Sequence, residues 1–198
     1  MNDSFVTRPS LLIRIKDSQD ADAWGQFIDI YSPLIYRFGR KKGLQDADAA
    51  DLTQDVLRAV SGAIERLNYE PRIGKFRGWL FTVAQNKLRD QIAKRKRHPR
   101  GSGDTQLRSF LENQPDSEDA LSALWDQEYD RCLFEWASDR VRPRFQKKTW
   151  DAFWQTSVEG TAARQVAEQL DITVGAVYIA KSRVLADLKT EIEKHIGY

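Results

Sequence analysis

Apolar residues recur along most of the chain at the spacing of an amphipathic helix. Between Trp24 and Phe38 they follow one another at steps of three and one, which gathers them on one side of a helix. Ser32 and Pro33 suit an N-cap and a first helical position, so we expect a kink or a break near Pro33. No stretch shows the alternation and hairpin turns that predict β-strands. The pattern therefore predicts an all-α fold.

Two more helices are predicted in the first half of the chain. Residues 46–67 form one amphipathic helix, and residues 75–97 form a longer one after a loop that contains Pro71 and Gly74. The first of these helices carries a polar row on the side opposite its apolar stripe, made of Asp51, Gln54, Asp55 and Arg58. Such a row is most often a solvated helix face.

Breaker-rich sequence separates the two halves. Residues 98–116 are polar and contain Pro99, Gly101, Gly103 and Pro115, as expected of a linker. Ser117 then supplies an N-cap with acids in the first turn of the next helix. We therefore predict two small helical domains, residues 1–99 and 118–198, joined by a flexible linker at 100–117 that is acidic toward its end.

The last two predicted helices, 162–170 and 174–194, are joined by only three residues. Apolar positions on both helices have the spacing at which a helix-turn-helix packs, and Thr173 suits an N-cap of the second helix. The turn residue that is usually glycine is Asp171, which tolerates left-handed backbone better than most residues. The sequence predicts a helix-turn-helix, and as a bare helical hairpin it leaves DNA binding open.

The chain of 198 residues has a net charge of only +2, but the charges are separated along it. Residues 72–100 carry ten Lys or Arg and one acid, for a local charge of +9. Residues 112–139 carry nine acids and one base, for −8. Blocks of opposite sign indicate separate surfaces with separate partners.

The sequence lacks the residues and motifs that several classes of chemistry require. With one cysteine, Cys132, and two histidines, His98 and His195, there is no disulfide and no ligand set for a zinc site. The sequence also lacks the phosphate-loop, dinucleotide and nucleophile-elbow motifs, so we expect no enzyme, no metal and no cofactor. It shows neither a secretory signal nor an apolar run long enough to span a membrane, and we expect a cytoplasmic protein.

The polar face of the 75–97 helix has an unusual composition. Trp79, Asn86 and Arg89 share it with Thr82 and Gln85. An aromatic ring beside amide and guanidinium groups suits unstacked bases, and the run 94–97 that follows suits phosphates. Two plainer interpretations stay open: Trp79 packs on a neighbouring helix, and the basic run only aids solubility.

Taken together, these motifs resemble a sigma-70 family RNA polymerase sigma factor of the small extracytoplasmic-function (ECF) type, from about Trp24 to Leu188. Residues 51–56 (Asp-Leu-Thr-Gln-Asp-Val) resemble the polymerase-binding helix of that family. Residues 76–81 (Phe-Arg-Gly-Trp-Leu-Phe) with 84–86 and the basic tail resemble its promoter-melting helix. Residues 159–183 resemble its C-terminal helix-turn-helix, although Tyr178-Ile179-Ala180 stands where many members carry Lys-Ser-Arg.

The resemblance implies a role for each surface. Domain 1–99 would be region 2-like, and its polar row would bind core RNA polymerase at the clamp helices of the β′ subunit. Contacts to the −10 promoter element are expected from Arg77, Trp79, Gln85, Asn86, Arg89, Lys94, Arg95, Lys96 and Arg97. Domain 118–198 would be region 4-like, with contacts to the −35 element expected from Thr173, Tyr178, Lys181, Ser182 and Arg183.

The implied partners are core RNA polymerase, including its β flap, and promoter DNA, with a chain that is monomeric when free. The sequence does not show whether an anti-sigma protein or another regulator also binds. The alternative function is a dimeric helix-turn-helix regulator of duplex operators. The sequence favours the sigma factor, because such a regulator has no use for Trp79 and Asn86 on a basic helix.

Overall fold

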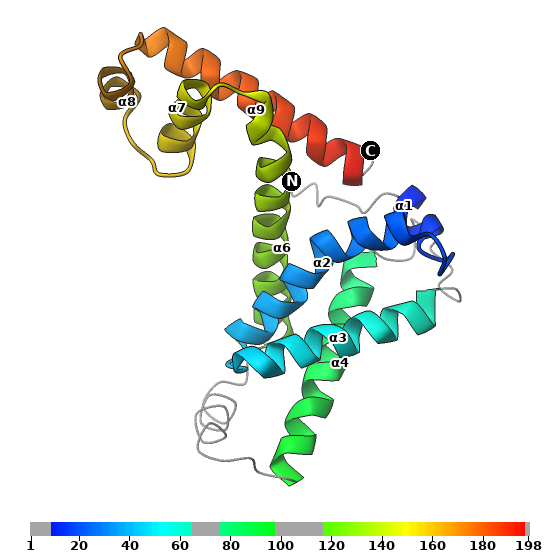
Figure 1. The fold of residues 1–198 in the computed structure, drawn as a ribbon. Coiled ribbons are helices and arrows are strands. Elements are labelled where there is room, and N and C mark those ends of the chain that lie inside the picture. Colours follow the sequence, from blue (N-terminus) through cyan, green and yellow to red (C-terminus); the bar gives the residue numbers. More distant parts are fainter. Residues whose placement is uncertain (1–8, 65–75, 98–116, 197–198) are drawn as a thin grey trace. The chain divides into compact units, whose positions relative to one another are not determined.

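The computed structural model describes residues 9–64, 76–97 and 117–196. The chain divides into two compact units, Met1–Cys132 with the last two residues and Leu133–Ile196, and each is treated by itself. The described residues form helices and turns without any β-strand (Figure 1). The predicted all-α fold class is confirmed.

Helix α3 is central to the first unit because it packs on both α2 and α4. The helices of this unit are α1 (Pro9–Arg14), α2 (Ala21–Lys41), α3 (Asp46–Ile64) and α4 (Phe76–Arg97), together with the first half of α6 (Glu118–Val141). Figure 1 shows α3 crossing α4. Helices α2 and α3 approach closely at the buried Gly39, where a Cβ atom would lie 3.1 Å from Leu52 Cδ2. The predicted start of α3 at residue 46 is observed, while residues 65–67 of the predicted helix lie outside the described residues.

The break expected near Pro33 is wrong, since α2 continues through this residue. A proline inside a helix costs about 3 kcal/mol, because it removes one hydrogen bond and crowds the preceding turn. Burial of a large apolar side chain contributes about 1.5–3 kcal/mol. On both sides of Pro33 the buried stripe is unbroken, with Phe27, Ile30 and Tyr31 before it and Leu34, Ile35 and Phe38 after it. Packing of the whole stripe therefore outweighs the local penalty.

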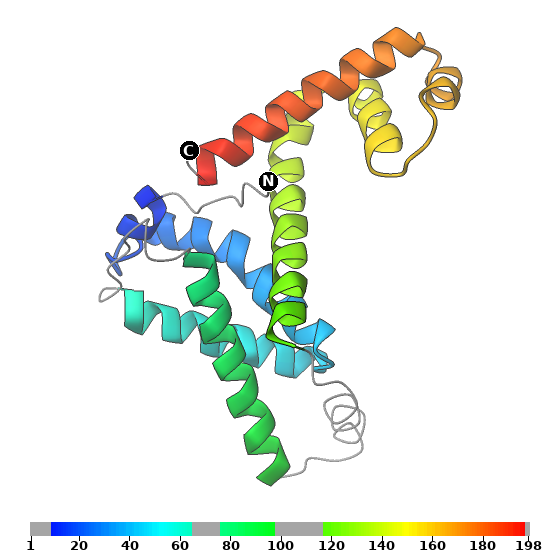
Figure 2. The same cartoon turned by 180° about the vertical axis from the view of Figure 1, so that it is seen from behind.

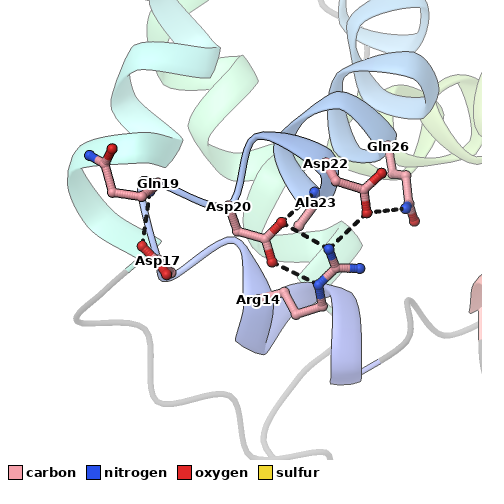
Figure 3. Close-up of polar contacts among 7 residues, drawn as sticks. All are labelled: Arg14, Asp17, Gln19, Asp20, Asp22, Ala23 and Gln26. Carbon is pink, nitrogen blue, oxygen red and sulfur yellow. Dashed lines mark hydrogen bonds and ion pairs between the residues drawn. The ribbon is translucent and has the colours of Figure 1, made fainter.

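An ion-pair network joins α1 to the start of α2 (Figure 3). Arg14 donates to both carboxylate oxygens of Asp20 and to Asp22, each over 2.8 Å. Asp20 is also the N-cap of α2 and accepts from the Ala23 N–H, while Gln26 donates to Asp22. Hydrogen bonds from Arg14 hold the pKa of both carboxyl groups below their ordinary value. The network fixes the angle at which the chain enters α2.

The first half of α6 belongs to the first unit. Trp125 is 1% exposed, and its ring lies 5.3 Å from that of Phe38 and 5.6 Å from that of Phe81. Tyr129 is buried beside Tyr31. The N-cap expected at Ser117 is present, because its hydroxyl accepts from the Ala120 N–H over 3.2 Å. The two compact units divide within α6, between Cys132 and Leu133. The predicted linker falls mostly on residues outside the described part, so the domain bounds at residues 99 and 118 stay predictions.

The second unit consists of the rest of α6, a short 3₁₀ turn (η1, Arg142–Arg144), α7 (Lys147–Ser157), α8 (Ala163–Leu170) and α9 (Val174–Ile196). Figure 2 shows α7 and α8 from behind, beside the start of α9. Its core joins Ala152 of α7 to Val166 and Ala167 of α8 and to Val177 and Ala180 of α9. These small side chains let α7, α8 and the start of α9 approach closely.

Two left-handed residues set the turns around α8. Gly160, with φ +74°, precedes it, and Asp171, with φ +51°, ends it. The N–H of Asp171 closes the last turn of α8, and Ile172 then packs on the core. Asp171 therefore takes the conformation for which glycine is usual.

Candidate functional site

The polar row on α3 is a connected surface. Arg58 Nη1 donates to Asp55 Oδ1 and Arg58 Nη2 donates to Gln54 Oε1, both over 3.0 Å. Asp51 lies one turn before Asp55 and is exposed. These hydrogen bonds link three of the four side chains, with acid and amide oxygens around one guanidinium. A partner with exposed cations and carbonyl groups would match this row.

The open face of α4 carries four of the nine residues expected to contact the −10 element. Asn86, Arg89 and Lys94 are exposed, and Trp79 is half-buried with its ring 5.4 Å from that of Phe76. Trp79 and Asn86 lie two turns apart on one side of the helix. The backbone of residues 95–97 completes α4, but the side chains of Arg95, Lys96 and Arg97 lie outside the described part.

Arg77 and Gln85 are turned away from the open face of α4, and Arg77 lies against α6. The Arg77 side chain is 11% exposed, pairs with Asp126 over 3.0 Å, and places its guanidinium carbon 4.8 Å from the centre of the Tyr129 ring. Gln85 is 8% exposed, and its Nε2 atom has no hydrogen-bond partner in the described structure. These two residues do not join Trp79 and Asn86 on the open face, and their roles toward DNA stay predictions. Phe81, one turn from each, was the signal in the sequence for a second packed side.

The contact between α6 and the rest of the first unit contains poorly satisfied polar groups. Glu128 has a side chain 4% exposed, and its nearest cation is Lys41 Nζ, at 3.8 Å from Oε1. Its Oε2 atom and the Nε1 atom of Trp125 have no hydrogen-bond partner in the part of the chain that is described. Each such group costs about 1–3 kcal/mol when it is buried. These unpaired polar groups therefore offset part of the stabilisation that burial of the aromatic rings gives to the packing of α6.

The start of α9 exposes the residues predicted for the second DNA element. Tyr178, Ser182 and Arg183 are exposed, and Lys181 is half-buried. Thr173 caps the helix as expected, since its Oγ1 accepts the Ala176 N–H over 3.1 Å. Sequence analysis did not single out Val174, an apolar residue at the first helical position that is exposed to solvent. Its place directly after the N-cap was the available signal.

Neither a metal-ligand cluster nor a membrane-spanning helix is present among the described residues. Among them no three His, Cys, Asp or Glu side chains come together as ligands for a metal ion. None of the described helices is both long enough and apolar enough to cross a membrane.

Most of the helices of the first unit lie in a segment that matches a known protein family. Residues 27–98 match the family described as sigma-70 region 2, and they include both the polar row of α3 and the open face of α4. This segment of the chain is similar to region 2 of sigma-70 family sigma factors. Asp126 and Tyr129, which hold Arg77, lie outside the matched segment. The family resemblance expected from the sequence motifs is confirmed.

Three relatives extend the likeness. SigE of Mycolicibacterium smegmatis, an ECF RNA polymerase sigma factor, is 22% identical over 90% of this chain and 65% of its own length. BldN of Streptomyces coelicolor, also an ECF RNA polymerase sigma factor, is 31% identical over 46% of this chain and 33% of its own. NccH of Alcaligenes xylosoxydans, an RNA polymerase sigma factor, is 30% identical over 58% and 56%. The chain spans less than two thirds of the length of each of these relatives.

Proposed function

We propose that the chain is a promoter-specificity subunit of RNA polymerase with no catalytic activity of its own. The match of residues 27–98 to sigma-70 region 2 carries this proposal, because it covers the two surfaces that such a subunit needs. A protein with this role acts in the cytoplasm, where the polymerase and the DNA are.

The polar row of α3 is the proposed docking surface for the clamp helices of the β′ subunit. Asp51, Gln54, Asp55 and Arg58 present hydrogen-bonding groups of both signs, and the Arg58 hydrogen bonds hold Gln54 and Asp55 in place before binding. A surface that is already ordered loses little side-chain entropy on association. The second unit would dock separately, on the β flap.

The open face of α4 is the proposed surface for the −10 element. Trp79 offers a ring on which an unstacked base can lie, Asn86 offers hydrogen bonds to a base edge, and Arg89 and Lys94 offer charge to the phosphates. Unstacking costs a few kcal/mol per step, which contacts to the exposed bases would offset. Residues 95–97 extend the positive charge along the strand.

Arg77 differs from the other proposed DNA contacts because its side chain is mostly buried. In the free chain its guanidinium is occupied by Asp126 and Tyr129, so it is not available to DNA until the first half of α6 moves away. Gln85 is buried as well. We therefore assign Trp79, Asn86, Arg89 and Lys94 to the first contacts, and Arg77 and Gln85 to a later stage.

The α8–α9 pair is the proposed helix-turn-helix for the −35 element. Its second helix has an exposed start carrying Tyr178, Ser182 and Arg183, with Lys181 beside them and Thr173 at its cap. The first residues of a recognition helix are the ones that reach base edges in the major groove.

A dimeric regulator of duplex operators is the alternative, and binding to core polymerase distinguishes the two. We expect the chain to bind core RNA polymerase as a monomer, and Asp55→Arg to weaken that binding at least tenfold with an unchanged circular dichroism spectrum. Asp90→Arg makes the same charge change on α4 and should leave core binding intact. If Asp55→Arg binds as well as the natural chain, the docking surface lies elsewhere. If the natural chain binds duplex DNA as a dimer and core not at all, the regulator is correct.

A further inference from the structure

The start of α9 exposes apolar side chains that its own fold does not use. Seven large apolar side chains are exposed in the described part of the chain, and three of them fall within the first six residues of α9. These are Val174 at 39%, Tyr178 at 61% and Ile179 at 62%. The side of the helix that packs on the core is supplied by other residues, Val177, Ala180 and Val184. The exposed residues are therefore available to a partner.

Gly175 leaves a gap between two of these side chains. At about 100° per residue it lies roughly 60° from Tyr178 and 40° from Ile179, one turn nearer the helix start. A Cβ atom at this position would meet only Thr173 Oγ1, at 3.9 Å, and the backbone has no positive φ here. Nothing within the unit requires glycine, which is a poorer helix former than alanine. A bare stretch of backbone flanked by Tyr178 and Ile179 suits the close approach of another molecule.

The charges around this patch favour a polyanion over a protein surface. Lys181 lies roughly 60° beyond Tyr178 on the helix and Arg183 roughly 40° beyond Ile179, so a cation borders each side of the patch. Arg164 of α8 adds a third cation in the open hollow between the two helices, where Glu168 and Asp171 also lie. None of these three cations has an ion-pair partner in the described structure. Apolar side chains flanked by cations match the major groove of DNA, because its floor is partly apolar and phosphates line its edges.

The apolar feature that a base pair offers in the major groove is the 5-methyl group of thymine. Recognition of guanine commonly uses Arg or Lys, and recognition of adenine uses Asn or Gln. The first ten residues of α9 contain no Asn or Gln, and Arg183 lies at the edge of the exposed patch. Ile179 and the ring of Tyr178 therefore distinguish bases chiefly by contact with a methyl group, whereas the hydroxyls of Tyr178 and Ser182 can bond to a base edge or a phosphate.

We propose that Tyr178 and Ile179 determine promoter specificity by packing on thymine methyl groups, with Gly175 allowing α9 to sit deep in the groove. The inference rests on the proposed role of α9 at the −35 element and names the chemistry that it recognises. Lys181 and Arg183 hold the phosphates on the two sides and carry no base preference of their own.

The test uses the full chain bound to core RNA polymerase and duplexes randomised at the −35 position. Selection should enrich thymines, and replacing each with uracil removes only the methyl group. For a contacted methyl we expect about a fourfold loss of affinity in the natural chain. Ile179→Ala should bind the thymine duplex more weakly and lose the difference between thymine and uracil. Val158→Ala removes an exposed apolar side chain outside α9 and should keep the difference.

Gly175→Ala separates recognition from folding. The added methyl group fits the free chain, so the melting temperature should stay the same or rise, while affinity for the selected duplex should fall several-fold. The proposal is overturned if uracil binds as well as thymine in the natural chain, or if Ile179→Ala leaves DNA affinity unchanged, which would assign the patch to a protein partner. Both results would leave binding to core and the proposed sigma function intact. Failure to bind core and to select any duplex would overturn both.

Discussion

Trp125 tests most sharply whether the first half of α6 belongs to the first unit. The change Trp125→Ala removes a fully buried ring from between Phe38 and Phe81. Deleting such a side chain costs about 3–5 kcal/mol from lost burial and the cavity left behind. Removing the buried Nε1 atom, which has no hydrogen-bond partner in the described residues, returns about 1 kcal/mol or slightly more. We therefore expect the free energy of unfolding to fall by about 2–4 kcal/mol.

Urea unfolding followed by circular dichroism measures this loss, and hydrogen exchange locates it. For a slope of about 2 kcal/mol per molar urea, the midpoint should fall by roughly 1–2 M. Amides of α2 and α4 should lose protection, because their side chains line the space vacated by the ring. Gln127→Ala is the control on the exposed side of the same helix and should change stability by no more than about 0.5 kcal/mol. A loss below about 1 kcal/mol for Trp125→Ala would show that α6 does not pack on α2 and α4.

Three further predictions concern the open face of α4, the turn after α8 and the network at α1. Asn86→Ala should lower open-complex formation at a cognate promoter by about 1–3 kcal/mol per lost base contact, and unchanged permanganate reactivity of the opened bases would contradict the role of Asn86. Asp171→Gly should stabilise the second unit by up to about 1 kcal/mol, because glycine adopts the left-handed conformation at this position without steric strain. A lower melting temperature would show that the Asp171 side chain contributes more to stability than the strain costs. Since Arg14 lowers the pKa of Asp20 in the folded chain, the network stabilises above the ordinary value of 3.8 and is lost as pH falls below it. Protection of the amides at the α1–α2 turn, taken as the ratio of intrinsic to observed exchange rate at each pH, should then fall in acid. Arg14→Gln should remove most of that pH dependence.

Helix boundaries were predictable where local signals decide them. The start of α9 follows from Thr173, and that of α4 from an apolar residue every fourth position beginning at Phe76. Pro33 shows the opposite case, because its local penalty is set against a buried stripe that extends over the whole of α2. A rule based on the proline alone leaves out the stabilisation that comes from burying that stripe.

The sides of α4 could be predicted only in part. One side follows from the apolar arc, and the opposite face, with Asn86 and Arg89, is exposed as its composition indicated. The position of Arg77 depends on α6, whose contacting residues Asp126 and Tyr129 come about fifty positions later in the sequence. No property of α4 alone specifies that partner.

The separation of charge along the sequence also has a local explanation in the structure. Asp126 and Glu128, from the acidic block, lie against Arg77 and Lys41 of the first unit. The acidic block therefore contributes to folding of the free chain, in addition to any role toward the polymerase. A count of charges shows the two blocks but not which members meet.

The most direct measurement of the central claim is run-off transcription with core RNA polymerase and the purified chain on DNA that contains a cognate promoter. We predict that core alone gives no transcript from that start site, that the chain alone gives none, and that the two together give a single defined product. A chain that binds core yet never directs initiation, or one that only shifts duplex DNA without core, would contradict the account.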